Sequence, residues 1–192
     1  MAFKLLFTAL LIGLSSLASG LDYVIDPSHT YASFEIDHLG FSTQRGQFNQ
    51  SSGSVQFDPA AQRGEIDITI DAASLNTGFA LRDDILRGES WFNTSAFPHI
   101  LFRSQHFIFD RENVDQNTPV AVEGRLTLLG ETRPMRLEIT RFKCGLNLVS
   151  RKHSCGADAS GTLKRSDFGL QNSIPFIGDE VRLRIQVEAY LP

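Results

Sequence analysis

Apolar and polar residues alternate along most of this chain, and this alternation limits its fold more than any other feature. In the stretch TYASFEIDH (30–38), the even-numbered positions from Ala32 to His38 form a mostly apolar set, whereas the odd-numbered ones include Glu35 and Asp37. A period of two is that of a β-strand, because successive side chains point to opposite faces. The pattern predicts a strand with one dry face.

The same alternation recurs in six further stretches. Their predicted inward residues are Val55 and Phe57; Ile66, Ile68 and Ile70; Ile100, Phe102 and Ser104; Val120, Val122, Gly124, Leu126 and Leu128; Met135, Leu137 and Ile139; and Val181, Leu183, Ile185, Val187, Ala189 and Leu191. Half-buried strands of this kind are typical of antiparallel sheets, whereas parallel strands covered by helices read as continuous apolar runs. The predicted fold class is therefore all-β and antiparallel.

Eight or so long strands and a single helix favour a closed barrel, with a two-sheet sandwich as the alternative. Eight strands enclose an interior that side chains either fill or leave open for one small ligand. Small residues on the inward side bear on this choice: Ala32, Gly124, Ala157, Ala159, Gly161 and Ala189. They either leave room for a tunnel or relieve crowding where the sheet bends, and both interpretations stay open.

One segment, GFALRDDILRGESWFN (78–93), breaks the alternation. Its apolar residues recur at helical spacing, acidic residues lie in its early turns, and Gly88 provides a stop. This predicts one short helix over about residues 77–87, capped by Asn76 or Thr77. Such a helix is suited to cover one mouth of the barrel as a lid.

The first twenty residues have the features of a secretory signal peptide. One cation precedes a short apolar run, and small residues at Ala18 and Gly20 provide two alternative cleavage sites. The apolar run is shorter than the roughly 20 residues that a membrane span needs. We expect residues 1–20 to be removed and residues 21–192 to form one exported, soluble domain.

Two cysteines, Cys144 and Cys155, remain in the expected mature chain. In an oxidising compartment they predict a structural disulfide, with a redox pair or half of a metal site as alternatives. The sequence has no C-x-x-C motif, and His153 alone does not complete a zinc site, so the structural bridge is preferred and no metal site is predicted.

The charge of the chain argues against a nucleic-acid partner. It has 18 Lys and Arg against 22 Asp and Glu, a formal net charge of −4, whereas nucleic-acid binding needs a basic surface. The basic stretch Arg151–Ser154 is interpreted as a solvated hairpin tip, with transient contact with an anionic membrane surface as the alternative. The sequence leaves open whether the protein is a monomer or a homodimer.

No common catalytic motif is present. The sequence lacks a G-x-S-x-G nucleophile elbow, an H-E-x-x-H zinc motif, a P-loop and a G-x-G-x-x-G dinucleotide motif. It therefore predicts no enzyme, no catalytic residues and no obligatory cofactor. Acid–base chemistry from dispersed groups such as His38 and Asp83 stays as a weaker alternative.

Several stretches, in this order, carry a family pattern: YVIDPSHTYASFEIDHLGFSTQRGQF (23–48), SLNTGFALRDDIL (74–86), FPHILFRS (97–104), GRLTLLGETRP (124–134), CGADASGTLKRSDFG (155–169) and GDEVRL (178–183). Each is weak alone, but together they resemble the YceI-like proteins, the polyisoprenoid-binding relatives of the lipocalins. The chain departs from the pattern at Leu129, where members often have His before the turn glycine. A polar ligand contact from that turn is therefore not expected.

The resemblance implies an extended, eight-stranded, lipocalin-like barrel in the periplasm. It also implies a long apolar channel that holds an isoprenoid chain, such as a quinone tail or a polyprenyl phosphate, or a similar amphiphile such as a fatty amide. The expected partner is thus a hydrophobic small molecule, in a transport or carrier role. The alternatives are a structural or interaction module with a filled barrel and, less favoured, an enzyme acting on an isoprenoid-type substrate.

Burial of hydrocarbon gives about 0.8 kcal/mol per methylene-sized group before the cost of association, so inward apolar residues and the aromatic residues after the helix are the expected lipid contacts. With two polar candidates at the rim, the predicted lipid-binding residues are Phe34, Ile36, His38, Phe57, Ile68, Ile70, Arg82, Trp91, Phe92, Phe102, Val122, Leu126 and Ile185.

The two polar candidates each have a structural alternative. Arg82 either meets an anionic or carbonyl headgroup or pairs with Asp83 or another carboxylate and anchors the helix to the barrel rim, and the structural role is preferred. His38 either donates to a ligand oxygen or is a satisfied structural residue.

Overall fold

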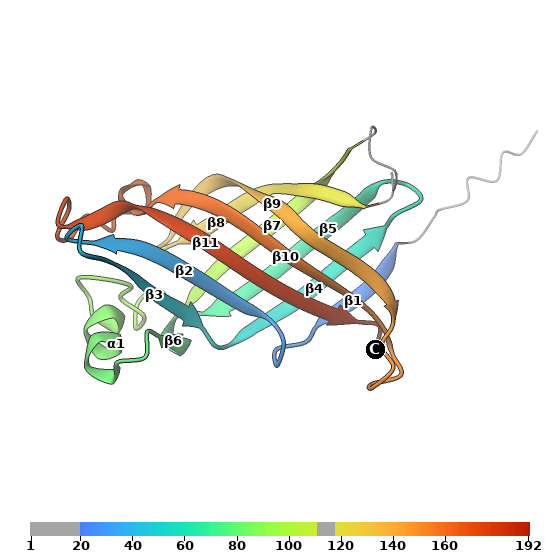
Figure 1. Ribbon diagram of the computed structural model, residues 1–192, viewed down its shortest axis with the longest axis horizontal. Coiled ribbons are helices and arrows are strands. Elements are labelled where there is room, and N and C mark those ends of the chain that lie inside the picture. The colour runs from blue at the N-terminus through green and yellow to red at the C-terminus, as the bar shows by residue number, and fades with distance from the viewer. Residues whose placement is uncertain (1–19, 111–117) are drawn as a thin grey trace, which may run out of the picture.

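The computed structural model describes residues 20–110 and 118–192, so the predicted leader lies outside the described residues except for Gly20. The strands are β1 (Leu21–Ile25), β2 (Tyr31–His38), β3 (Ser42–Phe48), β4 (Ser51–Asp58), β5 (Arg63–Asp71), β6 (Leu75–Asn76), β7 (His99–Phe109), β8 (Pro119–Leu128), β9 (Glu131–Leu146), β10 (His153–Lys164) and β11 (Ile177–Tyr190). One α-helix, α1 (Ala80–Arg87), and two 3-10 turns, η1 (Ala72–Ser74) and η2 (Arg165–Phe168), complete the described elements (Figure 1). None of these helices is long and apolar enough to cross a membrane.

These eleven strands occupy eight positions of one closed antiparallel barrel. Five positions hold a single strand each, β7 to β11, and the other three hold two strands in succession: β1 with β2, β3 with β4, and β5 with β6. Strand β11 makes this visible, because Ala189 near its end faces Ile25 of β1 whereas Ile185 faces Ala32 of β2. The pairing of β1 with β11 closes the ring. The predicted eight-stranded barrel is confirmed, and the sandwich is wrong.

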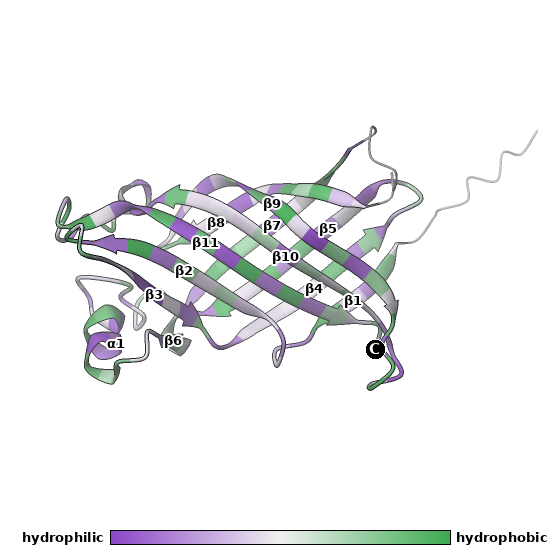
Figure 2. Cartoon of the chain, viewed as in Figure 1, coloured by the Kyte–Doolittle hydropathy of each residue, from purple (hydrophilic) through white to green (hydrophobic). Residues whose placement is uncertain are grey.

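The alternation in the sequence appears in the strands as alternating bands of hydropathy (Figure 2). Strand β7 shows where the alternation changes phase. A register shift between Ser104 and His106 interrupts its pairing with β8. Beyond the shift, Phe107 and Phe109 pack against Phe57, at 5.4 and 6.4 Å between ring centroids. A bulge of this kind adds one residue and re-aims the side chains that follow it.

Helix α1 begins later than predicted. Its N-cap residue is Phe79, which makes no side-chain capping bond, so neither Asn76 nor Thr77 is the cap. The reason is the turn at Gly78, whose φ of +78° lies in the left-handed region and directs the chain away before the helix starts. Gly88 follows the last helical residue, as predicted.

Helix α1 covers a gap beside β3. On the side of β3 away from β2, only Gln47 and Phe48 pair with a strand of the described chain, the two-residue β6. Arg82 of α1 donates from Nη1 to Oε1 of Gln44 in β3 at 2.6 Å. Arg87 donates to backbone carbonyls of the η1–β6 segment. The helix therefore completes the wall at this end of the barrel (Figure 1).

The opposite end of the barrel carries a cluster of aromatic side chains. Phe57 lies 5.2 Å from Phe142, between ring centroids, in addition to its contacts with Phe107 and Phe109. The disulfide between Cys144 and Cys155 joins β9 to β10 beside this cluster, which confirms the predicted bridge. Packed rings and a covalent link between neighbouring strands thus stabilise this end.

Candidate functional site

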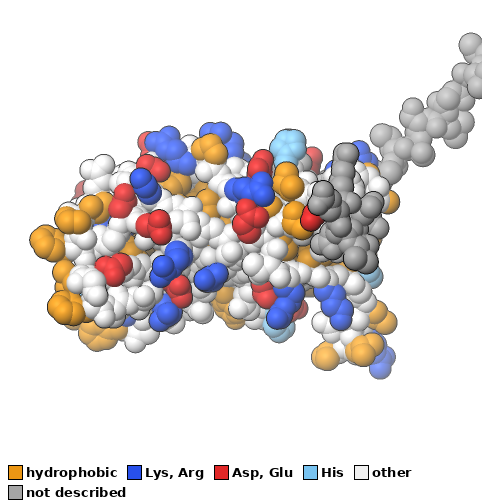
Figure 3. Space-filling view, turned by 45° about the horizontal axis from the view of Figure 1, so that its top comes forward, with side chains coloured by type: hydrophobic (Ala, Val, Ile, Leu, Met, Phe, Trp, Pro, Cys, Tyr) orange, Lys and Arg blue, Asp and Glu red, His pale blue; other side chains and the backbone are white. Residues whose placement is uncertain are grey.

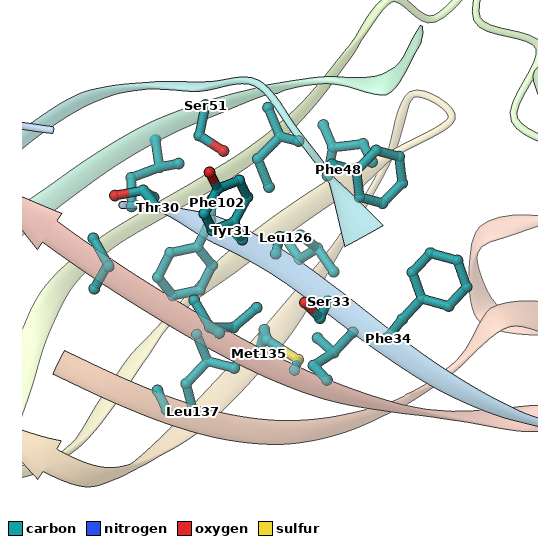
Figure 4. Close-up of a pocket in the computed structure, with 18 of the residues that line it drawn as sticks. Thr30, Tyr31, Ser33, Phe34, Phe48, Ser51, Phe102, Leu126, Met135 and Leu137 are labelled. Carbon is teal, nitrogen blue, oxygen red and sulfur yellow. The ribbon is translucent and has the colours of Figure 1, made fainter. Parts of the chain in front are cut away.

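The barrel encloses a cavity of about 500 Å³. Such a volume lies within the roughly 300–1,000 Å³ range of small-molecule sites. Side chains from several strands, such as Phe102 of β7 and Leu137 of β9, converge on it (Figure 4). The interior is therefore hollow, and a barrel filled by its own side chains is not what the structure shows.

The small inward residues divide into two groups. The alanines line the cavity: Ala32, Ala157, Ala159 and Ala189. The glycines make room for neighbouring groups instead, since a Cβ on Gly124 would lie 2.4 Å from the carbonyl oxygen of Arg103 and 2.9 Å from Cζ of Phe102, and one on Gly161 would lie 2.7 Å from Cε of Met135. Both interpretations of the small residues therefore apply, at different positions.

Every residue predicted to contact a lipid lies on the cavity wall. The thirteen are Phe34, Ile36, His38, Phe57, Ile68, Ile70, Arg82, Trp91, Phe92, Phe102, Val122, Leu126 and Ile185. They come from β2, β4, β5, β7, β8, β11, α1 and the segment after α1. The structure brings the whole set together around one space, and contact with a ligand stays a prediction.

The wall also contains residues that the sequence reasoning missed. Phe48 is one, because its strand STQRGQF has a single large apolar residue and shows no apolar alternation. Phe107 is another, because the bulge in β7 places it out of phase with Phe102. A signal for Phe48 is its place opposite Ala32, an inward residue of the neighbouring strand.

Arg82 is held by neutral oxygens. Its Nε donates to Oγ1 of Thr77 at 2.7 Å, its Nη2 to the carbonyl of Thr77 at 2.7 Å, and its Nη1 to Gln44. The expected pairing with Asp83 or another carboxylate is wrong, because the Thr77 hydroxyl lies between the two charges, accepting from Arg82 and donating to Asp83. Its anchoring of the helix is as expected.

Arg165 of η2 is a buried cation in the cavity wall that the sequence reasoning missed. It is 3% exposed. Its guanidinium donates to the carbonyl oxygens of Leu170, Asn172, Ile177 and Gly178 at 2.7–3.0 Å. Burial lowers the pKa of Arg165, and the nearby Asp179 carboxylate opposes this shift. Arg165 therefore holds the loop that precedes β11, at the α1 end of the barrel.

A family model described as the YceI-like domain matches residues 23–189, which span nearly all of the barrel. The chain belongs to the YceI-like family. Protein YceI of Escherichia coli O157:H7 is 33% identical over 189 residues, covering 96% of this chain and 94% of that protein. A UPF0312 protein of Enterobacter sp. (strain 638) is 35% identical over 176 residues, covering 89% and 87%.

Solved structures share the YceI-like barrel. A Campylobacter jejuni YCEI protein is 29% identical with a TM-score of 0.65, covering 80% of this chain and 88% of that one. BcnA of Burkholderia cenocepacia is 23% identical with a TM-score of 0.69, covering 85% and 98%. A polyisoprenoid binding domain from Saccharophagus degradans is 16% identical with a TM-score of 0.65, covering 90% and 99%. The last two show the fold alone.

One polar atom in the wall of this YceI-like cavity is left without a partner. The hydroxyl of Ser51 at the start of β4 is buried and has no hydrogen-bond partner among the described residues (Figure 4). Thr30, also on the wall, donates to the carbonyl of Glu188 at 3.2 Å and accepts from its amide at 3.1 Å. Ser51 is thus free to bond a polar atom inside the cavity.

Outside the cavity wall of the YceI-like barrel, Asp26, His29 and Glu188 place potential metal-ligand atoms within 4.8 Å of one another. His29 Nδ1 already hydrogen-bonds Oδ2 of Asp26 at 2.9 Å, which accounts for the proximity of these two residues. His38 and Asp83 were considered above as an acid–base pair. His38 lies on the cavity wall, whereas Asp83 does not.

Proposed function

We propose that this protein is a periplasmic carrier that holds a long-chain isoprenoid or a similar amphiphilic lipid inside the barrel. The observation that carries the proposal is the cavity of about 500 Å³, walled mainly by aliphatic and aromatic side chains. Polyisoprenoid binding by the Saccharophagus degradans domain, which shares the fold, supports it. The predicted signal peptide supports the compartment.

The size of the cavity suits a chain of this kind. Micromolar binding needs a net free energy of about 8 kcal/mol, in addition to an association cost of roughly 4–15 kcal/mol. At about 0.8 kcal/mol for each buried methylene-sized group, on the order of 15–30 such groups supply this total. We take the volume of each methylene-sized group as about 30 Å³, the volume of a water molecule in the liquid. The cavity of about 500 Å³ then holds a number of such groups near the lower end of the 15–30 range. Affinity then comes from length and fit.

The polar wall residues suggest an orientation for the ligand. Arg82 and His38 line the cavity at the α1 end, whereas Phe57 and Phe142 line it at the opposite end. An amphiphile in this cavity would place its polar head near Arg82 and its tail toward the packed rings. A guanidinium favours an oxygen-rich head, either anionic or carbonyl.

Native mass spectrometry, followed by organic extraction, tests the proposal on the full chain exported by a bacterial host. We expect one specific isoprenoid-type lipid at close to one molecule per protein. Repeated preparations of folded protein without any bound lipid would contradict the carrier function and favour an interaction module.

A variant that fills the cavity sharpens this test. Ala159 of β10 lies on the wall, so Ala159→Phe places a ring in the space that the ligand needs. We expect bound lipid to fall at least about tenfold. The matched control is Ser160→Phe, since the next residue along a strand faces outward. Thermal melting checks that both variants fold, and lipid retained in a folded Ala159→Phe variant would contradict the proposal.

A further inference from the structure

Exposed apolar side chains gather at the α1 end of the barrel. They come from three separate segments: the β2–β3 turn, the start and outer side of α1, and the loop before β11. We call them the apolar rim, and its members are Leu39, Phe41, Phe79, Leu81, Ile85, Ile174 and Phe176. Hydrophobic side chains are grouped at this end of the molecule, on the left of Figure 3.

Most of the apolar rim lies on segments without charged residues, and the exception is Ile85, which lies between Asp84 and Arg87 in α1. Charged residues make up 21% of the chain, yet none occurs in 39–43, 76–81 or 171–178. The charged residues that follow in α1 have partners: Arg82 and Asp83 through Thr77, and Asp84 through Arg87. Phe41 is 89% exposed and Phe176 is 66% exposed on these neutral segments.

The cavity reaches the surface among these residues. Ile85 is 55% exposed and also belongs to the cavity wall. Ile177, next to Phe176, lies on the wall as well. At the other end, the ring of Phe57 packs against those of Phe107 and Phe142. An apolar molecule that enters the cavity would therefore pass the apolar rim.

From these observations we propose that the apolar rim docks on the surface of a lipid bilayer, with the cavity mouth facing the membrane. Binding at the boundary between headgroups and acyl chains becomes stronger with the apolar area that is buried there. A protein partner is a poorer match, because protein interfaces surround an apolar centre with a polar, charged rim that selects the partner. Loading of the cavity from the membrane rests on the proposed function, whereas the docking itself does not.

The docking end differs from the one that the sequence pointed to. Transient membrane contact was expected, as an alternative, at Arg151–Ser154, which spans the end of the β9–β10 turn and the start of β10 at the opposite end. That turn carries Leu148 and Val149, which are 84% and 95% exposed, beside basic residues. Substitutions in this turn therefore provide a matched control. Its apolar side chains are about as exposed as those of the apolar rim, but they lie at the opposite end of the barrel and beside basic residues.

The test is flotation of the full mature chain with vesicles of phosphatidylcholine, and of phosphatidylcholine mixed with phosphatidylglycerol, at low and high salt. We expect comparable binding to both compositions and little effect of salt, because the side chains that would insert are apolar. The double variant Phe41→Ser, Phe176→Ser should bind at least about tenfold more weakly. The control Leu148→Ser, Val149→Ser should stay within about twofold of the parent chain.

Three results would overturn the inference: no flotation of the parent chain, loss of binding in the control variant instead, or binding that requires anionic lipid. Analytical ultracentrifugation adds a fourth, since a dimer that the Phe41→Ser, Phe176→Ser variant dissociates would make the apolar rim a contact between two copies. Lipid extraction separates the two proposals. Extracted lipid without flotation rejects the docking alone, whereas flotation without extracted lipid rejects the carrier function alone.

Discussion

The hydroxyl of Ser51 faces an apolar space without a partner among the described residues. A buried polar group left unbonded costs about 1–3 kcal/mol, and Ser51→Ala removes it with little change in volume. We expect the free energy of unfolding of the lipid-free protein to rise by about 1 kcal/mol, measured by urea denaturation. Ser52→Ala is the matched control on the exposed face of the same strand, with an expected change within about 0.5 kcal/mol. A destabilised Ser51→Ala variant would contradict this account.

A second prediction concerns Asp26 and His29 in the turn before β2. Hydrogen bonds from Ser28 and from His29 lower the pKa of Asp26, and the bond with Asp26 raises the pKa of His29. The stabilisation by His29 is fully present below the ordinary histidine pKa of about 6.5 and is lost as the pH rises through the raised value. The stabilisation by Asp26 is lost on the other side, as the pH falls through its lowered pKa.

The measurement for this pair is the NMR titration of the His29 ring. We expect its midpoint above about 6.5, and a shift back toward that value in Asp26→Asn. A midpoint for His29 that Asp26→Asn leaves unchanged would show that the carboxylate is not its cause.

At the scale of elements, Asp83 joins α1 to the turn that precedes it. Its Oδ1 accepts from the backbone amide of Thr77 at 2.8 Å and from the Thr77 hydroxyl, and the residue is 7% exposed. Asp83→Ala leaves these donors unpaired, so we expect a loss of about 1–3 kcal/mol in the free energy of unfolding. Amide hydrogen exchange over 76–87 should become faster.

The neighbouring residue supplies the control for this prediction. Asp84 forms an ion pair with Arg87 at 3.0 Å in which its own side chain is 73% exposed. Surface pairs of this kind contribute little, so Asp84→Ala should change the stability by less than about 0.5 kcal/mol. If the two alanine variants behaved alike, Thr77 and Asp83 would not be what holds the helix.

The strands and the helix differ in how well the sequence predicted them. Strands β5 and β11 could be predicted because large apolar residues mark their inward face. Strand β3 could not, because Gly46 lies where the ring of Phe34 occupies the inward space, at 2.5 Å from a Cβ placed there. The start of α1 was wrong by three residues, because the turn at Gly78 rather than a capping side chain decides it.

At the scale of the whole molecule, alternation predicts a dry face but not ring closure, which depends on the short pairing of β1 with β11. The number of strands and the single helix favoured a barrel over a sandwich, and the resemblance to a family supported it. The sequence also left open whether the small residues make space, since that depends on how far neighbouring side chains reach. Arg165 escaped prediction because its partners are backbone carbonyls of a loop, which no pattern of residue types encodes.

The wall beside β3 has a mechanical consequence. Most other adjacent positions of the barrel are joined by long backbone ladders, which separate only by breaking many bonds in succession. Helix α1 is tied across to β3 and to the η1–β6 segment by the side chains of Arg82 and Arg87. A brief outward movement of this one segment therefore breaks only a few hydrogen bonds, and it would admit a ligand from the side while the rest of the barrel keeps its shape.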